Sequence, residues 1–243
     1  MAVPCSPESY RRILEQAGQL GYSFVSFADF FANEAARQQS ILLRHDVDYS
    51  LELARELANI NASCGAMGTF FVQLRSPVYN LLEERNLVCL QEIVRNGQKL
   101  AVHFRYPPGG CSADELQASV GRELQIYQEE TGFQFESVVA WHNPTADLVG
   151  AESPFAGVEL LSAYAPPFFV DGHYFSDSNL RNMPEDFLRI LGEKRGTFLQ
   201  ILFHPFYWIV GGKSLTPILR ATMEQVITET ERGFLENPMW PGR

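Results

Sequence analysis

Histidines that could bind a metal ion follow or end short apolar segments of this sequence. The chain has five histidines, and four of them occur in this setting: His45 in LLRHDVD, His103 in LAVHFRY, His142 in VVAWHNP and His204 in LQILFHP. The carboxyl ends of parallel strands converge on the functional face of α/β folds. Imidazole and carboxylate groups are ligands of zinc and related divalent ions. We therefore expect these side chains to form a divalent metal site.

Two aspartates, Asp46 and Asp48, directly follow the first of these histidines. On an extended backbone alternate side chains share a face, so both carboxylates can point into one site. Carboxylates this close repel each other unless a cation lies between them or one is protonated. A metal held by Asp48 would leave Asp46 to take a proton from the attacking water. The alternative is that Asp48 or Ser50 caps the following helix, which would account for one acid but not for both.

Strand-like and helix-like segments alternate along the chain, and this alternation favours a parallel sheet with crossover helices. We expect strands over residues 41–45, 68–73, 99–104, 136–141 and 197–203, and helices over 8–20, 51–63, 86–96, 112–132, 184–191 and 216–234. Residues 144–171 are expected to be mostly loop. The fold class that this predicts is α/β, as a distorted or incomplete β/α barrel, with a doubly wound open sheet as the alternative.

Composition limits what the chain can be. Its 243 residues are 46% hydrophobic and 20% charged, which is typical of a globular protein, and we expect a single catalytic domain over 1–243. The net charge of -10 and the scattered basic residues argue against nucleic acid and anionic membrane as partners. The first twelve residues lack the apolar core of a signal peptide, and the four cysteines are widely spaced. We therefore expect a cytoplasmic protein, whose oligomeric state stays open.

Four segments together resemble a known family. They are LLRHDVDYSLELARELANI, GTFFVQ, the strand ending in His103, and ILFHP. Their order is similar to that in the polysaccharide deacetylase (NodB-homology, carbohydrate esterase family 4-like) superfamily, in the branch whose first motif is Asp-x-Asp within HDVD. The resemblance runs from about Ile41 to Trp208. It implies a distorted β/α barrel, a bound divalent metal, and hydrolysis of an N-acyl group, usually from an amino sugar.

The resemblance also implies residue roles. Asp46 matches the catalytic base, Asp48 the metal-binding acid, His103 the first metal histidine, and His204 the general acid. Family members commonly carry a second metal histidine four residues after the first, where this chain has Pro107. We infer from the remaining histidines that His142 supplies the third ligand. Zinc is the expected metal, with cobalt, nickel, manganese or iron as alternatives.

Several residues near these motifs are candidates for substrate binding. Arg105 is expected to reach an anionic group of the substrate, or else to be an outward-facing solvated side chain. Trp141, Tyr174 and Trp208 would form a stacking wall for a sugar ring, with simple packing as the alternative. Asp177 would hydrogen-bond substrate hydroxyls, although the same residue type is equally favoured in turns.

The expected function is therefore metal-dependent removal of an N-acyl group, with acetyl as the favoured group, from an amino sugar or a similar small amide. The partner is then a small N-acylated molecule. One alternative is an amide or formamide hydrolase acting on a non-sugar metabolite. The other is a catalytically inactive relative that binds a ligand, an alternative favoured by Pro107 and Arg105.

Overall fold

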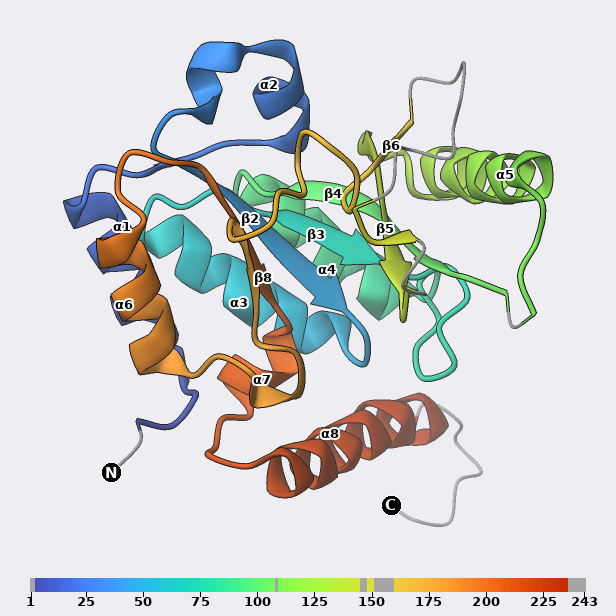
Figure 1. The fold of residues 1–243 in the computed structure, drawn as a ribbon. Coiled ribbons are helices and arrows are strands. Elements are labelled where there is room, and N and C mark those ends of the chain that lie inside the picture. The colour runs from blue at the N-terminus through green and yellow to red at the C-terminus, as the bar shows by residue number, and fades with distance from the viewer. Residues whose placement is uncertain (1–2, 108, 145–147, 151–159, 236–243) are drawn as a thin grey trace.

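The structure is a computed structural model, and it describes residues 3–107, 109–144, 148–150 and 160–235. One sheet of parallel strands forms its centre (Figure 1). The strands are β1 (Ser23–Phe24), β2 (Ser40–Val47), β3 (Thr69–Val72), β4 (Lys99–Arg105), β5 (Phe135–His142), β6 (Leu161–Ser162), β7 (Tyr174–Ser176) and β8 (Leu199–Phe203). They are ordered β6-β5-β4-β3-β2-β8-β7, with β1 paired to β2 outside this path.

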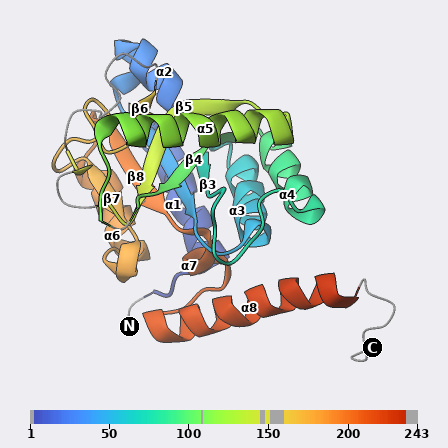
Figure 2. The ribbon, with the colours of Figure 1, turned by 90° about the vertical axis from the view of Figure 1, so that its right-hand side faces the viewer.

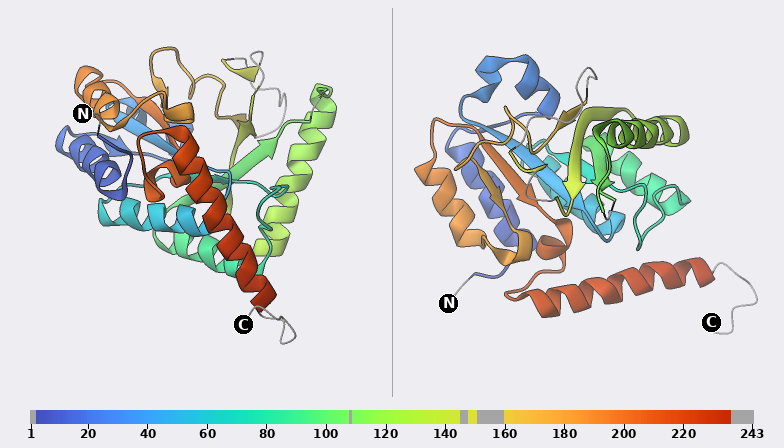
Figure 3. Two further views of the ribbon diagram at one scale, coloured as in Figure 1. Left: turned by 90° about the horizontal axis from the view of Figure 1, so that it is seen from below. Right: turned by 45° about the vertical axis from the view of Figure 1, so that its right-hand side comes forward.

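Eight helices accompany the sheet in the described part of the chain. They are α1 (Pro7–Gln19), α2 (Phe27–Ala32), α3 (Leu51–Ser63), α4 (Glu84–Arg95), α5 (Ala113–Thr131), α6 (Pro184–Glu193), α7 (Pro205–Ile209) and α8 (Leu215–Leu235). The short 3-10 turn η1 (Glu34–Arg37) lies between α2 and β2, and the turn η3 (Ser178–Leu180) lies between β7 and α6. Figures 2 and 3 show the sheet curling, with α1, α3, α4 and α5 around its outside and α8 crossing one end of the molecule.

The curled sheet confirms the predicted fold class. All strand pairs are parallel, and β6 and β7 stand at the two ends of the strand order, so the described strands form an incomplete barrel. The carboxyl ends of β2, β4, β5 and β8 consequently meet at one rim. This is the rim at which the sequence analysis places the metal site.

Local signals in the sequence determine where the main helices begin and end. The hydroxyl of Ser50 accepts a hydrogen bond from the backbone N–H of Leu53 and caps α3. Ser112 and Glu115 form the predicted capping box of α5, which ends at Gly132 with φ of 67°. Such a positive φ is accessible to glycine without a steric penalty. The predicted strands and long helices agree with the structure to within about three residues, as expected for such boundaries.

The short elements of the fold were not predicted from the sequence. β1, α2, β7 and α7 have two to six residues each, too few to show a clear period. Part of the predicted loop over 144–171 lies outside the described residues, and β6 falls in the remainder. Among the helices that the structure describes, none combines the length and apolar character that a membrane crossing requires.

Strand β2 divides the core into two sides. Ile41 and Leu43 pack with α1, α3 and α6, whereas Leu42 packs with the interior of the barrel. This alternation follows from the two-residue period of a strand. It places Arg44 and Asp46 on the inner face with Leu42, and His45 on the outer face. The two faces of β2 therefore carry different residues, and it is Asp46 on the inner face that lies beside His103 at the rim.

Candidate metal centre and active site

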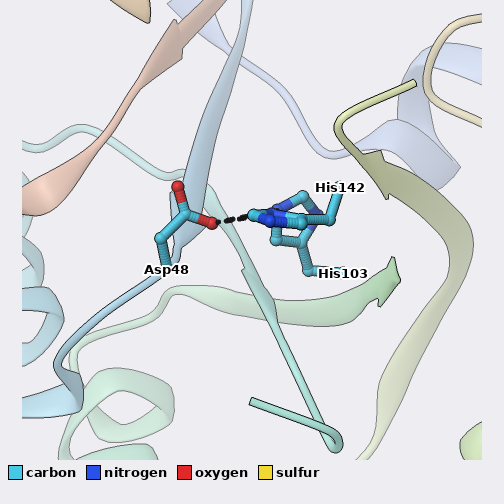
Figure 4. Close-up of side chains that lie close together, drawn as sticks. All are labelled: Asp48, His103 and His142. Atoms are coloured by element: carbon cyan, nitrogen blue, oxygen red, sulfur yellow. Dashed lines mark hydrogen bonds and ion pairs between the residues drawn. The ribbon is translucent and has the colours of Figure 1, made fainter. Parts of the chain in front are cut away.

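Three strand ends bring Asp48, His103 and His142 together (Figure 4). Asp48 follows β2, His103 lies in β4, and His142 ends β5. Asp48 Oδ1 lies 3.2 Å from His103 Nε2 and 3.2 Å from His142 Nδ1, and the two ring nitrogens are 3.3 Å apart. Three potential ligand atoms thus form a nearly equilateral triangle.

The triangle has the dimensions of one face of a metal coordination shell. Zinc binds histidine nitrogen and carboxylate oxygen at about 2.0–2.1 Å, so neighbouring ligand atoms lie about 2.8–3.4 Å apart in octahedral or tetrahedral geometry. The three measured separations fall in this range. Two imidazoles and one carboxylate also suit zinc, cobalt, nickel or iron in chemical type. The residues therefore fit a divalent ion.

Hydrogen bonds hold this triangle in a form suited to a cation. His103 Nδ1 lies 3.1 Å from the carbonyl oxygen of Ala140, and this contact orients the ring so that Nε2 faces Asp48. Burial alone would raise the pKa of Asp48, but hydrogen bonds from His103 and His142 lower it well below its usual range. The carboxylate is therefore charged at neutral pH, as a ligand must be.

His142 supplies the third side chain of the triangle from the neighbouring strand β5. In the parallel pairing of β4 with β5, Ala140 lies opposite His103, and His142 lies opposite Arg105. His142 therefore extends one strand period beyond His103 on the same face of the sheet. Pro107, where the resemblance noted in the sequence places a second metal histidine, lies beyond the end of β4. The neighbouring strand thus offers an imidazole in place of the one that Pro107 replaces.

Asp46 lies beside the triangle and is paired with an arginine that the sequence analysis missed. Arg44 donates from Nε and Nη2 to the two carboxylate oxygens, both at 2.7 Å, and both side chains are buried. Arg44 also donates to Tyr164 Oη at 2.8 Å. Burial alone would raise the pKa of Asp46, but the charges of Arg44 and His103 lower it. The signal for this pair was present, because a charged residue in an apolar strand, two positions from an acid, shares that acid's face.

His204 lies on the other side of Asp48 and is held by Asp177. His204 Nε2 is 3.7 Å from Asp48 Oδ2, while Nδ1 donates to Asp177 Oδ1 at 2.6 Å. Burial would lower the pKa of His204, but the charge and hydrogen bond of Asp177 outweigh it and raise the pKa to about 9. The imidazole is therefore protonated at neutral pH, with Nε2–H directed at the site.

Asp177 has a different place from the one predicted. It is fully buried, and besides the His204 ring it accepts hydrogen bonds from the His204 backbone N–H and from Trp208 Nε1, both at 2.8 Å. The carboxylate of Asp177 is thus buried and hydrogen-bonded to His204 and Trp208. We therefore correct its role from a contact for substrate hydroxyls to a partner of His204.

The two tryptophans also differ from their predicted place. Trp141 and Trp208 are both fully buried, so neither presents a ring face to a substrate. Because Trp141 precedes His142 on one strand, the two side chains must point to opposite faces, and Trp141 packs against Phe104. Trp208 packs against Phe203 and donates to Asp177. The stacking wall expected from these two residues is therefore replaced by packing.

The other two predicted substrate-binding residues differ in exposure: Tyr174 is partly buried, whereas Arg105 is exposed. Tyr174 is partly buried and packs against Tyr164 and Phe169, which places it behind the Arg44–Asp46 pair. Arg105 is exposed at the end of β4, opposite His142 in the strand register. Of the two, Arg105 is the one located at the rim of the site.

His45 does not join the other three strand-end histidines. It lies on the outer face of β2, fully buried, with Nε2 3.0 Å from Asn61 Nδ2 and 3.5 Å from Tyr10 Oη. Burial lowers its pKa to about 3, so the ring is neutral. The expectation that all four would converge is thus wrong for His45, because it is adjacent to Asp46 and faces the opposite way.

A large cavity lies away from this cluster. It has a volume of about 450 Å³ and is lined by residues that include Phe27, Phe31, Glu136 and Leu161. Glu136 is at the amino-terminal end of β5, whereas His142 ends that strand. A second cavity of about 450 Å³ also borders Glu136, so size does not single out either one. The convergence of ionisable groups points to the opposite rim.

No family model matches the sequence, and no curated protein matches it. Solved structures do match. A Streptococcus pyogenes deacetylase in complex with acetate has 14% sequence identity and a TM-score of 0.49, over 76% of this chain and 86% of that one. The chitin deacetylase of the fungal pathogen Colletotrichum lindemuthianum has 13% identity and a TM-score of 0.49, over 76% and 81%.

A third match is a mutant, with restored enzymatic activity, of a CE4 family pseudoenzyme from Bacillus anthracis. Its identity is 15% and its TM-score 0.46, over 78% of this chain but only 63% of that one. At these values the likeness concerns the general fold, and the account of the site rests on this chain's own geometry.

Proposed function

We propose that this chain is a metal-dependent hydrolase that removes an N-acyl group, acetyl in the first instance, from an amino sugar or a similar small amide. One observation supports the proposal above others. Asp48, His103 and His142 form a closed triangle of ligand atoms, and an acid and a protonated imidazole flank it. Metal-dependent amide hydrolysis uses three components, namely a Lewis acid, a proton acceptor and a proton donor.

The triangle would hold the ion, for which we propose zinc. A divalent ion in this position supplies Lewis-acid polarisation of the scissile carbonyl. Of the three side chains, His103 is the most buried, while Asp48 and His142 are 13% and 19% exposed. A substrate can therefore approach from the side of Asp48 and His142.

Asp46 would accept the proton of the attacking water. Arg44 occupies one lone pair on each of its oxygens, and each oxygen keeps a second lone pair. Asp46 Oδ2 lies 3.7 Å from His103 Nε2, so it borders the triangle. Arg44 fixes the orientation of this carboxylate and keeps it ionised, which is a positioning role.

His204 would donate a proton to the leaving amine. Its Nε2–H faces the triangle, and its Nδ1–H is engaged by Asp177. Without such a donor the nitrogen would have to leave as an unstable anion. Asp177 holds the ring in one orientation and favours its protonated form, as a carboxylate partner does in other acid–base sites.

We further propose that the substrate is a soluble monosaccharide, a nucleotide-linked sugar or a similar small molecule. We also propose that the protein acts in the cytoplasm. The four cysteines are free thiols, which such a reducing compartment would maintain. The exposed guanidinium of Arg105 beside His142 would bind an acidic group of the substrate.

A screen of small N-acyl compounds tests the proposal. Protein reconstituted with zinc, cobalt, nickel, manganese or iron would be incubated with N-acetyl and N-formyl amino sugars and with non-sugar amides. Released acetate or formate is then measured, with His103→Ala as the control. We expect metal-dependent release from at least one sugar substrate. Activity confined to non-sugar amides would favour the alternative hydrolase, and activity confined to polymeric chitin or peptidoglycan would contradict the proposed substrate size.

An inactive ligand-binding relative is the second candidate. Pro107 in place of the second metal histidine is the observation that favours it. The position of His142 argues against it, because this side chain offers the missing imidazole. A protein that binds zinc at this site but hydrolyses none of the screened compounds would favour the inactive relative.

A further inference from the structure

Gln73 lies beside the triangle, and no role has been assigned to it above. It directly follows β3, and Val72 pairs with Val47, so Gln73 stands next to Asp48 across the sheet. Its side chain is almost fully buried, with 1% of the residue exposed. Nε2 donates to Asp48 Oδ1 at 3.0 Å and lies 3.4 Å from His142 Nδ1. The amide therefore touches two of the three candidate ligand atoms.

The other end of this amide is unsatisfied. Gln73 Oε1 is buried, and within the described part of the chain it has no hydrogen-bond partner. Leaving a buried carbonyl without a partner is costly, and such groups are rare in folded proteins. Because this unpaired oxygen is buried beside the candidate metal-binding triangle, it indicates that Gln73 interacts with a ligand bound there.

A half-turn of the amide would place the oxygen where an ion on the triangle could meet it. The oxygen and nitrogen of a carboxamide have nearly the same size and shape, so rotation about the last side-chain bond exchanges them. Oε1 would then take the present place of Nε2, beside Asp48 Oδ1 and His142 Nδ1. The separations of 3.0 and 3.4 Å match those between neighbouring ligand atoms of one metal ion.

We propose that Gln73 is a further metal ligand, which binds the divalent ion through Oε1. The inference rests on the proposed function, since it needs the ion that Asp48, His103 and His142 would hold. Without the ion, the N–H of Gln73 stabilises the charge of Asp48. With the ion present, that charge is compensated by the cation, and the amide is free to present its oxygen instead. A neutral carbonyl adds a ligand without adding charge.

A crystal structure of the protein soaked with zinc or manganese chloride alone tests this directly. We expect Gln73 Oε1 at a bonding distance of about 2.0–2.3 Å from an ion on the triangle. An ion on Asp48, His103 and His142 with the Gln73 amide still donating to Asp48 would overturn the inference and leave the proposed metal centre intact. The absence of an ion from the triangle would overturn both.

Calorimetric titration with zinc provides the measurement in solution. Because Gln73 is proposed as a direct ligand, Gln73→Leu is expected to weaken zinc binding by more than the about 10–100-fold typical of residues that only support a ligand. Gln98→Leu is the matched control, because Gln98 is also a buried glutamine but hydrogen-bonds Asn61 on the outer side of β2. Thermal unfolding of both variants reports any general loss of stability. Unchanged affinity in Gln73→Leu, or an equal loss in Gln98→Leu, would overturn the inference.

Discussion

Asp177 Oδ1 and His204 Nδ1 lie 2.6 Å apart, although 27 residues separate them in the sequence. They are brought together because β7 and β8 are parallel neighbours, with Ser176 opposite Leu202. Each residue follows the end of its strand closely, so both reach the same rim. The pair fixes the ring so that Nε2 faces Asp48, and it makes the charge state of His204 depend on Asp177.

Replacing Asp177 should change the pH dependence of the reaction. The pKa of His204 is raised to about 9 mainly by Asp177, against the effect of burial. A general acid works only while protonated, so activity should fall as the pH rises through this pKa. In Asp177→Asn the pKa falls, and the alkaline limb of kcat/KM should move to lower pH. An alkaline limb at the wild-type position, with zinc affinity unchanged, would show that Asp177 does not control the acid.

Asp46 and His204 should be needed for turnover but not for metal binding. Asp46→Asn keeps the shape of the side chain and removes the proton acceptor, while His204→Gln removes the donor. General acid–base groups contribute about 10²–10⁴-fold, so each variant should lose kcat by that order while zinc affinity changes little. Single-turnover kinetics and calorimetry measure the two quantities. Near wild-type kcat in either variant, with zinc bound, would mean that another residue has that role.

His142 should matter for metal binding as much as His103. Both ring nitrogens lie within 3.2 Å of the same Asp48 oxygen. Loss of a direct ligand should exceed the 10–100-fold loss of affinity typical of residues that only support a ligand. His142→Ala and His103→Ala should therefore lose zinc to a similar extent, and His173→Ala, in the loop before β7, should not. Full zinc occupancy in His142→Ala would mean that the third ligand lies elsewhere.

Two substitutions of Arg44 should distinguish its effect on catalysis from its effect on stability. Lysine keeps the charge but cannot make the two parallel hydrogen bonds that Arg44 makes to Asp46. Arg44→Lys should therefore lower kcat with little change in zinc affinity. Arg44→Met would leave the buried Asp46 charge unpaired, and removing one partner of such a pair costs about 3–5 kcal/mol. Denaturant unfolding measures this loss, and a fully stable Arg44→Met with normal kcat would exclude the positioning role.

The sequence predicts the framework well because β2, β3, β4, β5 and β8 are buried on both faces and therefore contain continuous apolar runs. It predicts the convergence of Asp48, His103 and His142 for the same reason, since each follows or ends such a run. The side on which each residue lies was also available from alternation. Adjacent residues point to opposite faces, so His45 cannot accompany Asp46, nor Trp141 accompany His142.

Other features of the site could not be predicted from the sequence. β7 has only three residues, so nothing in the sequence shows that Asp177 ends a strand beside β8. The packing of Tyr164 against Arg44 joins residues 120 positions apart. The hydrogen bond of Gln73 to Asp48 depends on the register of β2 with β3, which an apolar pattern does not determine.

Zinc binding by the wild-type protein, measured by calorimetry and by elemental analysis after dialysis, tests the central claim most directly. The account predicts one tightly bound ion per chain, because Asp48, His103 and His142 already have the spacing of a coordination shell. Asp48→Asn should abolish this binding. A folded wild-type protein that binds neither zinc nor cobalt, nickel, manganese or iron, or that binds zinc equally well with Asp48 replaced, would contradict it.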